Sequence, residues 1–256
     1  MQRIDDFLTR IVDRATTRRE ESPLGRAYFN DQLPSVWDLN FFLAEGGSAE
    51  ELAAEADRLQ GDAGLAHRRV TAAGDHGTSV MDEFLELRWD AEPLVRMVRA
   101  RAPDRAAEHR VEEVAMEEVA PVYRDYRETE SFGADAGTLQ ALARRDGLIA
   151  EAGRGRFFAV REEGRVVSFC GLYTDGRTAQ VEDVITARPH RGRGHARSVV
   201  MRAAHEASAA GADLVFLQAE REGWPRKFYE RLGFDQVGTV WNFVRRPAFV
   251  AERQNR

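Results

Sequence analysis

Three strand-like segments joined by two short glycine turns are the feature of this sequence that most restricts its fold. Residues 156–186 read RFFAVREEGRVVSFCGLYTDGRTAQVEDVIT, and the turns are EEG and TDG. β-Branched and aromatic residues on both sides of such turns are typical of neighbouring antiparallel strands. The stretch therefore predicts an antiparallel meander against which the rest of its domain has to pack.

The residues around this meander predict further helices and strands. In HARSVVMRAAHEASAAG, residues 195–211, apolar side chains recur at helical spacing and Gly211 is a stop signal. DLVFLQA then reads as a buried strand, PRKFYERLG as a helix and TVWNFVRR as a strand. Ahead of the meander we expect a short strand in HRVEEV and helices in MEEVAPVYRDYRETE and AGTLQALARRDGLIAEA. This half is predicted to be an α/β fold (α+β type) with a mixed, mainly antiparallel central sheet.

The first half of the chain also alternates helices and strands. An opening amphipathic helix precedes a strand predicted from Val36 to Ala44. Ser48 and Glu51 then have the spacing of a capping box, which predicts the start of a helix. AHRRVTA and PLVRMVRA read as strands, and TSVMDEFLELR between them as a helix.

The composition changes at RAPDRAAE, between these two halves. We therefore predict two domains, a smaller N-terminal α/β lobe at residues 1–105 and a second domain at residues 106–256. A chain of 256 residues is long enough for each to bury a core.

Net charge and cysteine usage exclude several classes of protein. A formal charge of −6 argues against general affinity for nucleic acid or an anionic membrane. Cys170 is the only cysteine, so no disulfide forms within the chain, and its strand-like setting predicts a small buried residue. No segment has the length and apolar character of a signal peptide or a membrane span. We expect a cytoplasmic protein.

A basic turn, RPHRGRGHAR, lies at residues 188–197 between the third meander strand and the next helix. Backbone N–H groups of a glycine turn and the positive end of a helix together bind phosphate. The turn has no lysine, which a Walker loop needs, and an antiparallel meander precedes it, unlike a dinucleotide fingerprint. His190 and His195 have no cysteine or carboxylate partner at metal-ligand spacing, so no metal is expected. A small molecule that carries a diphosphate is the ligand these features favour.

Four features together resemble the GCN5-related N-acetyltransferase (GNAT) family. RGRGHA, residues 191–196, resembles the family's Arg/Gln-x-x-Gly-x-Gly/Ala signature. VEDVITARP is similar to its fourth strand, DLVFLQA to its fifth strand, and FYERLGF to its tyrosine-bearing helix. The resemblance covers roughly residues 108–246. Residues 1–105 lack these motifs and are compatible with a degenerate lobe of the same family.

The resemblance implies that acetyl-CoA is the cosubstrate, with no metal. Its pyrophosphate would be held by six residues of the turn, mostly through N–H groups. These are Arg191, Gly192, Arg193, Gly194, His195 and Ala196. Backbone groups of Val184, Ile185 and Thr186 would pair with the pantetheine arm. Arg188 and Arg197 are expected to be solvated.

For the chemistry, the resemblance gives Tyr229 the place of the family's general acid, with plain packing as the alternative. Glu182 or Asp183 would be the base that deprotonates the amine. Strand alternation sends these neighbours to opposite faces, and we favour Glu182. Glu222 stands where the family often has an asparagine. We favour a plain surface residue there, and contact with a cationic acceptor is the alternative.

The favoured activity is transfer of an acetyl group from acetyl-CoA to a primary amine, by direct attack through a tetrahedral intermediate. A small-molecule acceptor is favoured. Two alternatives stay open: a non-catalytic acyl-CoA-binding sensor or scaffold, and a protein N-terminal or lysine acetyltransferase. The sequence leaves the amine, the acyl-chain preference and the presence of a homodimer undetermined.

Overall fold

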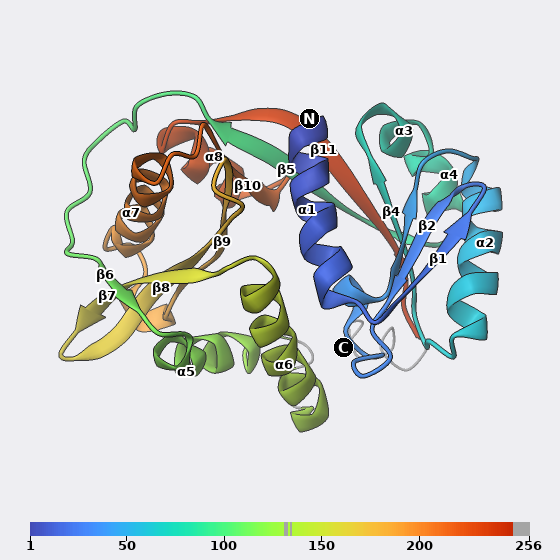
Figure 1. The fold of residues 1–256 in the computed structure, drawn as a ribbon, viewed down its shortest axis with the longest axis horizontal. Helices are drawn as coiled ribbons and strands as arrows, with labels where there is room; N and C mark the ends of the chain where they lie inside the picture. Colours follow the sequence, from blue (N-terminus) through green and yellow to red (C-terminus); the bar gives the residue numbers. More distant parts are fainter. Residues whose placement is uncertain (131–132, 134, 248–256) are drawn as a thin grey trace. The chain divides into compact units, whose positions relative to one another are not determined.

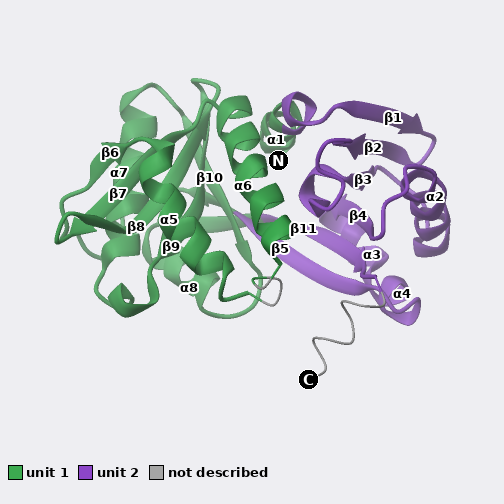
Figure 2. Cartoon of the chain, turned by 90° about the horizontal axis from the view of Figure 1, so that it is seen from below, with its two compact units in different colours: residues 1–11, 97–237 green, residues 12–96, 238–256 purple. Residues whose placement is uncertain are grey.

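The computed structural model describes residues 1–130, 133 and 135–247 of the chain (Figure 1). These residues form two compact units (Figure 2). Unit 1 comprises Met1–Ile11 and Met97–Val237, and unit 2 comprises Val12–Arg96 and Gly238–Arg256. Strands β5 (Asp90–Arg99) and β11 (Phe234–Arg245) each contain the residue at which the chain leaves one unit for the other.

The predicted meander is the centre of unit 1 and is confirmed. Its strands are β7 (Arg156–Glu162), β8 (Arg165–Thr174) and β9 (Thr178–Thr186), and each pair of neighbours is antiparallel. β6 (Glu112–Val114) extends it antiparallel beside β7. β10 (Leu214–Glu220) runs parallel to β9 on the other side, so the sheet is mixed and mainly antiparallel, as predicted.

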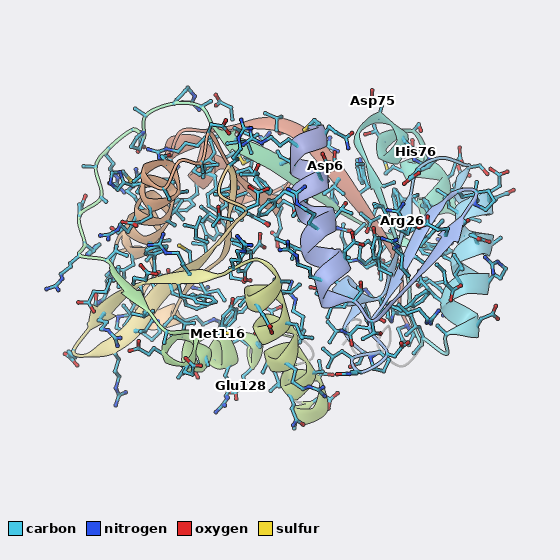
Figure 3. All side chains as sticks on the ribbon, viewed as in Figure 1. Asp6, Arg26, Asp75, His76, Met116 and Glu128 are labelled. Carbon is cyan, nitrogen blue, oxygen red and sulfur yellow. The ribbon has the colours of Figure 1, made fainter. Side chains whose placement is uncertain are left out.

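Helices cover both faces of this sheet. The helices are α5 (Met116–Arg127), α6 (Ala136–Ala152), α7 (His195–Ala209) and α8 (Trp224–Arg231), together with the start of α1 (Gln2–Ala15). Neighbouring residues of β8 point to opposite faces. The Cys170 thiol donates to the Val199 carbonyl of α7, and the adjacent Phe169 ring lies 4.7 Å from the Tyr123 ring of α5. α7 and α5 therefore pack on opposite faces. Figure 3 labels Met116, the first residue of α5, and Glu128, which follows its last residue.

Cys170 is fully buried, which confirms its predicted role as a small core residue. Burial also raises the pKa of its thiol far above the usual range. An uncharged thiol without exposure is a poor nucleophile.

In unit 2 the strands follow the order β1-β2-β3-β4-β11, which is one end of the eleven-stranded sheet of the described chain. The first four of these strands are β1 (Arg18–Ser22), β2 (Gly25–Phe29), β3 (Phe41–Ala44) and β4 (Arg68–Ala73). Helix α2 (Ala49–Asp62) begins at Ser48 with the predicted capping box formed. Two further short helices are α3 (Gly74–Ser79) and α4 (Met81–Glu86).

Three local predictions in unit 2 differ from the structure. The strand expected from Val36 to Ala44 is a 3-10 turn, η1 (Trp37–Leu39), followed by the four residues of β3. The helix expected in TSVMDEFLELR is divided between α3 and α4 at Val80. The β1–β2 hairpin was not predicted, because RREES lacks the apolar alternation of a half-buried strand.

The compact units do not coincide with the predicted lobes at residues 1–105 and 106–256. The first helix contributes its residues up to Ile11 to unit 1, and the chain from Gly238 onward belongs to unit 2. Residues 248–256 of the predicted second domain lie outside the described residues. Among the described helices, none is long and apolar enough to cross a bilayer.

Candidate active site

The two parallel strands of unit 1 separate towards their carboxyl ends. Their register pairs Leu214, Val215 and Phe216 with residues 178–180, while β9 continues to Thr186 and β10 to Glu220. Beyond the last pair, the facing N–H and C=O groups of the two strands are available to a ligand. A cleft of about 840 Å³ lies here, lined by residues 181–186 of β9 and by Gln218 and Glu220 of β10.

A β-bulge in β9 shapes this cleft. The register with β8 shifts by one residue between the pairs Gly171–Glu182 and Phe169–Ile185. Asp183 lies at the shift with a φ of 53°, in the left-handed region that non-glycine residues rarely adopt. Bulges of this kind redirect side chains and end the regular pairing of a strand. Here the bulge places an irregular stretch of backbone against the cleft.

The bulge overturns the alternation predicted for the two carboxylates. Glu182 pairs with Gly171 and therefore shares the face of β8 on which Tyr173 lies. The Tyr173 hydroxyl donates to Asp183 Oδ2 at 3.1 Å, so Asp183 reaches this same face. Gln180 donates to Glu182, two residues before it on the strand. Both carboxylates line the cleft, because the extra residue breaks the period-two pattern.

The basic turn forms a tight bend between β9 and α7. It starts as a 3-10 turn, η2 (Arg188–His190), and the Arg191 side chain donates to the Thr186 carbonyl at 3.1 Å. Gly192 and Gly194 have φ values of 78° and 87°, and Gly194 is the N-cap of α7. A side chain at such φ values is strained, so glycine suits both positions. The first N–H groups of α7 have no partner inside the helix, and this bend directs them at the cleft.

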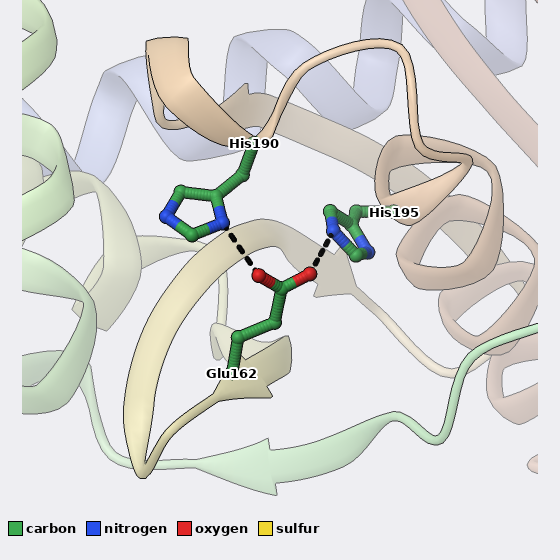
Figure 4. Close-up of side chains that lie close together, drawn as sticks. All are labelled: Glu162, His190 and His195. Atoms are coloured by element: carbon green, nitrogen blue, oxygen red, sulfur yellow. Dashed lines mark hydrogen bonds and ion pairs between the residues drawn. The ribbon is translucent and has the colours of Figure 1, made fainter.

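Glu162, at the end of β7, connects both histidines of the bend (Figure 4). Its Oε2 lies 2.7 Å from His190 Nδ1, and its Oε1 lies 2.8 Å from His195 Nε2. The sequence-based argument that these histidines have no carboxylate partner was therefore wrong. The partner lies 28 residues before His190 in the chain, where no local spacing could indicate it.

Burial and a second imidazole determine the state of His195. Its side chain is 1% exposed, and burial lowers its pKa, with the neighbouring His109 ring acting in the same direction. The two rings lie 4.3 Å apart, and His109 Nε2 lies 2.7 Å from the Arg193 carbonyl. His109 thus connects the segment before β6 to the bend.

The two arginines that were expected to be solvated differ in their exposure. Arg188 is exposed and lines the cleft. Arg197 is 4% exposed; its Nη1 lies 2.6 Å from Asp104 Oδ1 and donates to the Arg105 carbonyl at 3.1 Å. For Arg197 the expectation was wrong, because residues 104 and 105 lie over the first turn of α7 and pair with it.

Tyr229 projects from α8 into the cleft. Its ring lies 5.1 Å from the Phe228 ring and 6.3 Å from the Phe234 ring, so it also packs. Burial raises the pKa of its hydroxyl well above the usual value, and the Glu182 carboxylate adds to this. The phenol is therefore protonated at neutral pH and can donate a proton to a ligand in the cleft.

The structure brings together nearly all the residues predicted for the site. Tyr229, Glu182 and the predicted cosubstrate-binding residues line one cleft, except Arg193, whose side chain turns to Glu162. Glu222 is exposed and outside the lining, while Glu220, two residues earlier, is part of it. Lining residues that the sequence did not predict include Tyr126, Thr129, Glu130, Gln218, Glu220, Trp224 and Phe228. Tyr126 lies in the last turn of α5, and Thr129 and Glu130 follow its end, where no sequence pattern indicates a shared site.

A mixed sheet that opens between two parallel strands, beside the N-terminus of a helix, forms a cleft suited to a ligand that carries phosphate. Residues 116–234 match the family model described as Acetyltransferase (GNAT) family. This segment is a GNAT domain, and the family implies acyl transfer from acyl-CoA. No curated protein matches the sequence.

Solved structures share this fold. A GCN5-related N-acetyltransferase from Kribbella flavida is 18% identical, with a TM-score of 0.67, over 98% of this chain and 97% of that chain. A conserved protein of unknown function from Staphylococcus epidermidis is 12% identical, with a TM-score of 0.70, over 91% of this chain and 94% of that chain. A tandem GNAT protein from the clavulanic acid biosynthesis pathway is 14% identical, with a TM-score of 0.53, over 81% of this chain and 73% of that chain.

Proposed function

We propose that the protein is an N-acetyltransferase that moves an acetyl group from acetyl-CoA to the primary amine of a small molecule. The observation that carries the proposal is the cleft between the separated ends of β9 and β10. It has an anion-binding helix terminus at the bend, and a protonated phenol and two carboxylates in its wall. These are the groups that acetyl transfer from a thioester to an amine requires.

The bend binds the pyrophosphate of acetyl-CoA in this proposal. The N–H groups from Gly192 to Ala196 would donate to the phosphate oxygens, and Arg191 would add charge. The arm of the cosubstrate would then pair with the backbone of residues 184–186 as an added strand. Its thioester would end close to the bulge and to Tyr229.

Proton transfers at the amine nitrogen and at the leaving sulfur complete the reaction. The acceptor amine has to lose a proton before it attacks, and Glu182, held by Gln180, is the base in this proposal. The nitrogen then bonds to the carbonyl carbon and gives a tetrahedral intermediate. The intermediate collapses by breaking the carbon–sulfur bond, and Tyr229 protonates the leaving thiolate. The nitrogen gives up its second proton, which restores the Tyr229 hydroxyl, and the proton on Glu182 passes to solvent.

The walls of the cleft favour a small cationic acceptor. Its carboxylates are Glu130, Glu182, Asp183 and Glu220, which attract an ammonium group. A volume of about 840 Å³ is within the usual range for small-molecule sites. We place the reaction in the cytoplasm, where acetyl-CoA is available and the lone thiol of Cys170 stays reduced.

The first test is Tyr229→Phe, which removes the hydroxyl and keeps the ring contacts with Phe228 and Phe234. We expect kcat to fall about 100-fold, because the thiolate loses its proton donor. Calorimetry with acetyl-CoA should give an unchanged Kd. An unchanged kcat would remove Tyr229 from the reaction.

An assay of thiol release from acetyl-CoA across a panel of small amines and peptides separates the alternatives. Turnover with a small amine supports the proposal. Binding of acetyl-CoA without turnover on any acceptor would indicate a sensor or scaffold. Turnover with peptides alone would indicate a protein acetyltransferase.

A further inference from the structure

Glu162, His190 and His195 form a group of metal-ligating side chains that the proposed reaction does not use. Each offers one donor atom, a carboxylate oxygen or an imidazole nitrogen, and these atoms all lie within 4.8 Å of one another. The carboxylate lies between the two imidazoles, with one oxygen directed at each (Figure 4). Two histidines and one glutamate are a known ligand set for a divalent transition ion.

The distances are close to those that a bound ion needs. Ligands at about 2.1 Å from a tetrahedral zinc ion lie roughly 3.4 Å apart. The carboxylate–imidazole separations of 2.7 and 2.8 Å are shorter than this, and the widest separation in the group is at most 4.8 Å. An ion would therefore need only small side-chain movements to take all three ligands.

His195 gives a second, independent indication. Its side chain is almost fully buried, and neither ring nitrogen makes a hydrogen bond of proper geometry. Nε2 lies at ion-pair distance from Glu162 but without the alignment of a hydrogen bond. A buried polar ring without such a partner is costly, and a metal bound at Nε2 would compensate for it.

The surrounding charges oppose a cation without excluding one. Arg193 Nη1 lies 3.2 Å from Glu162 Oε2, and His195 is at the positive end of α7. Arg193 is half exposed, so its side chain can turn to water when an ion takes the carboxylate. Lone electron pairs on two neutral imidazoles bind a transition ion more strongly than they bind a hard cation such as Mg²⁺.

We infer that Glu162, His190 and His195 bind one divalent transition ion of the zinc type, which fixes the bend that forms the anion site. His190 and His195 lie at the two ends of this bend, whereas Glu162 lies on strand β7. A bound ion would tie both ends to β7 and hold the intervening N–H groups in one arrangement. It would also add positive charge beside the phosphate site.

The test uses the full chain after treatment with a chelator, without any cosubstrate, so it does not depend on the proposed reaction. Calorimetry with zinc chloride measures stoichiometry and affinity, and visible absorption with cobalt chloride reports the coordination. We expect one ion per chain and the intense bands of four-coordinate cobalt. Bound zinc should also slow amide hydrogen exchange in residues 190–196.

Two variants and one control assign the site. Glu162→Gln keeps the shape of the side chain, and His190→Ala removes a half-exposed ring, so both are expected to fold. Each should weaken zinc binding at least about 10-fold. His205→Gln, an exposed histidine on α7, should bind zinc as the wild type does. Absence of zinc binding, or equal affinity in the wild type and both variants, would overturn the inference.

Discussion

At the scale of single residues, the backbone of Asp183 determines which groups can act in the cleft. Its left-handed φ belongs to the bulge that turns Glu182 and Asp183 to the same face. The two carboxylates still differ in their partners. Asp183 accepts from the Tyr173 hydroxyl, whereas Glu182 accepts from the Gln180 amide. Of the two carboxylates, Glu182 raises the pKa of the Tyr229 hydroxyl more strongly than Asp183 does, which favours Glu182 as the base opposite this acid.

This difference gives a prediction for the two isosteric amide variants. Glu182→Gln should lower kcat about 100-fold or more, because the amide cannot take a proton from the ammonium group. Asp183→Asn keeps an oxygen for the Tyr173 hydroxyl and should lower kcat less than about 10-fold. Steady-state kinetics of both variants over a range of pH is the measurement. The opposite order of the two effects would assign the base to Asp183.

At the scale of elements, the N-terminus of α7 connects the fold to the proposed cosubstrate site. The bend can bind a phosphate only if its N–H groups point at one spot. Its two glycines, whose φ values are in the left-handed region, allow that geometry. The nearest atom to a β-carbon built on Gly194 would be His109 Nε2 at 3.6 Å, an ordinary contact. An added methyl group therefore acts through backbone strain and not through a clash.

Gly194→Ala tests this element. We expect a loss of roughly 1–2 kcal/mol in stability, since alanine is strained at a φ of 87°. Acetyl-CoA affinity should fall at least about 10-fold as the bend relaxes and its donors diverge. Gly211→Ala is the matched control, because Gly211 follows the other end of α7 with a φ of 99°. This control should lose similar stability in thermal unfolding and keep its affinity for acetyl-CoA in calorimetry. A similar loss of affinity in the control would show that the effect of Gly194→Ala is not specific to the bend.

The elements were more predictable from the sequence than the contacts between them. The meander, α7 and the capping box at Ser48 follow from local patterns, and all three are present. The bulge does not follow, because an extra residue leaves no mark in a nine-residue strand with mixed polarity. Glu162 could not be assigned to the histidines either, since only the register of the sheet brings β7 to the bend. Local periodicity predicts an element, but side-chain pairs distant in sequence depend on how elements pack.

At the scale of the whole molecule, neither compact unit is one continuous stretch of chain. Unit 1 takes residues 1–11 from the start of the chain, and unit 2 takes residues from Gly238 onward. Strand β11 pairs antiparallel with β4 in unit 2, from Val240–Ala73 to Arg245–Arg68. Contacts this distant in sequence form late and are slow to close. The core of unit 2 therefore depends on residues near the C-terminal end of the described chain.

Phe243→Ala measures how much unit 2 depends on that strand. Phe243 is fully buried, and its ring stacks on Phe84 at 4.1 Å and lies parallel to Trp241 at 6.1 Å. Truncation removes these contacts and leaves a cavity, so we expect a loss of about 3–5 kcal/mol in the free energy of unfolding. Val237→Ala, on the same strand but 45% exposed, should change it by less than about 0.5 kcal/mol. Urea unfolding followed by fluorescence gives both values, and equal stability of the two variants would mean that β11 contributes little to this core.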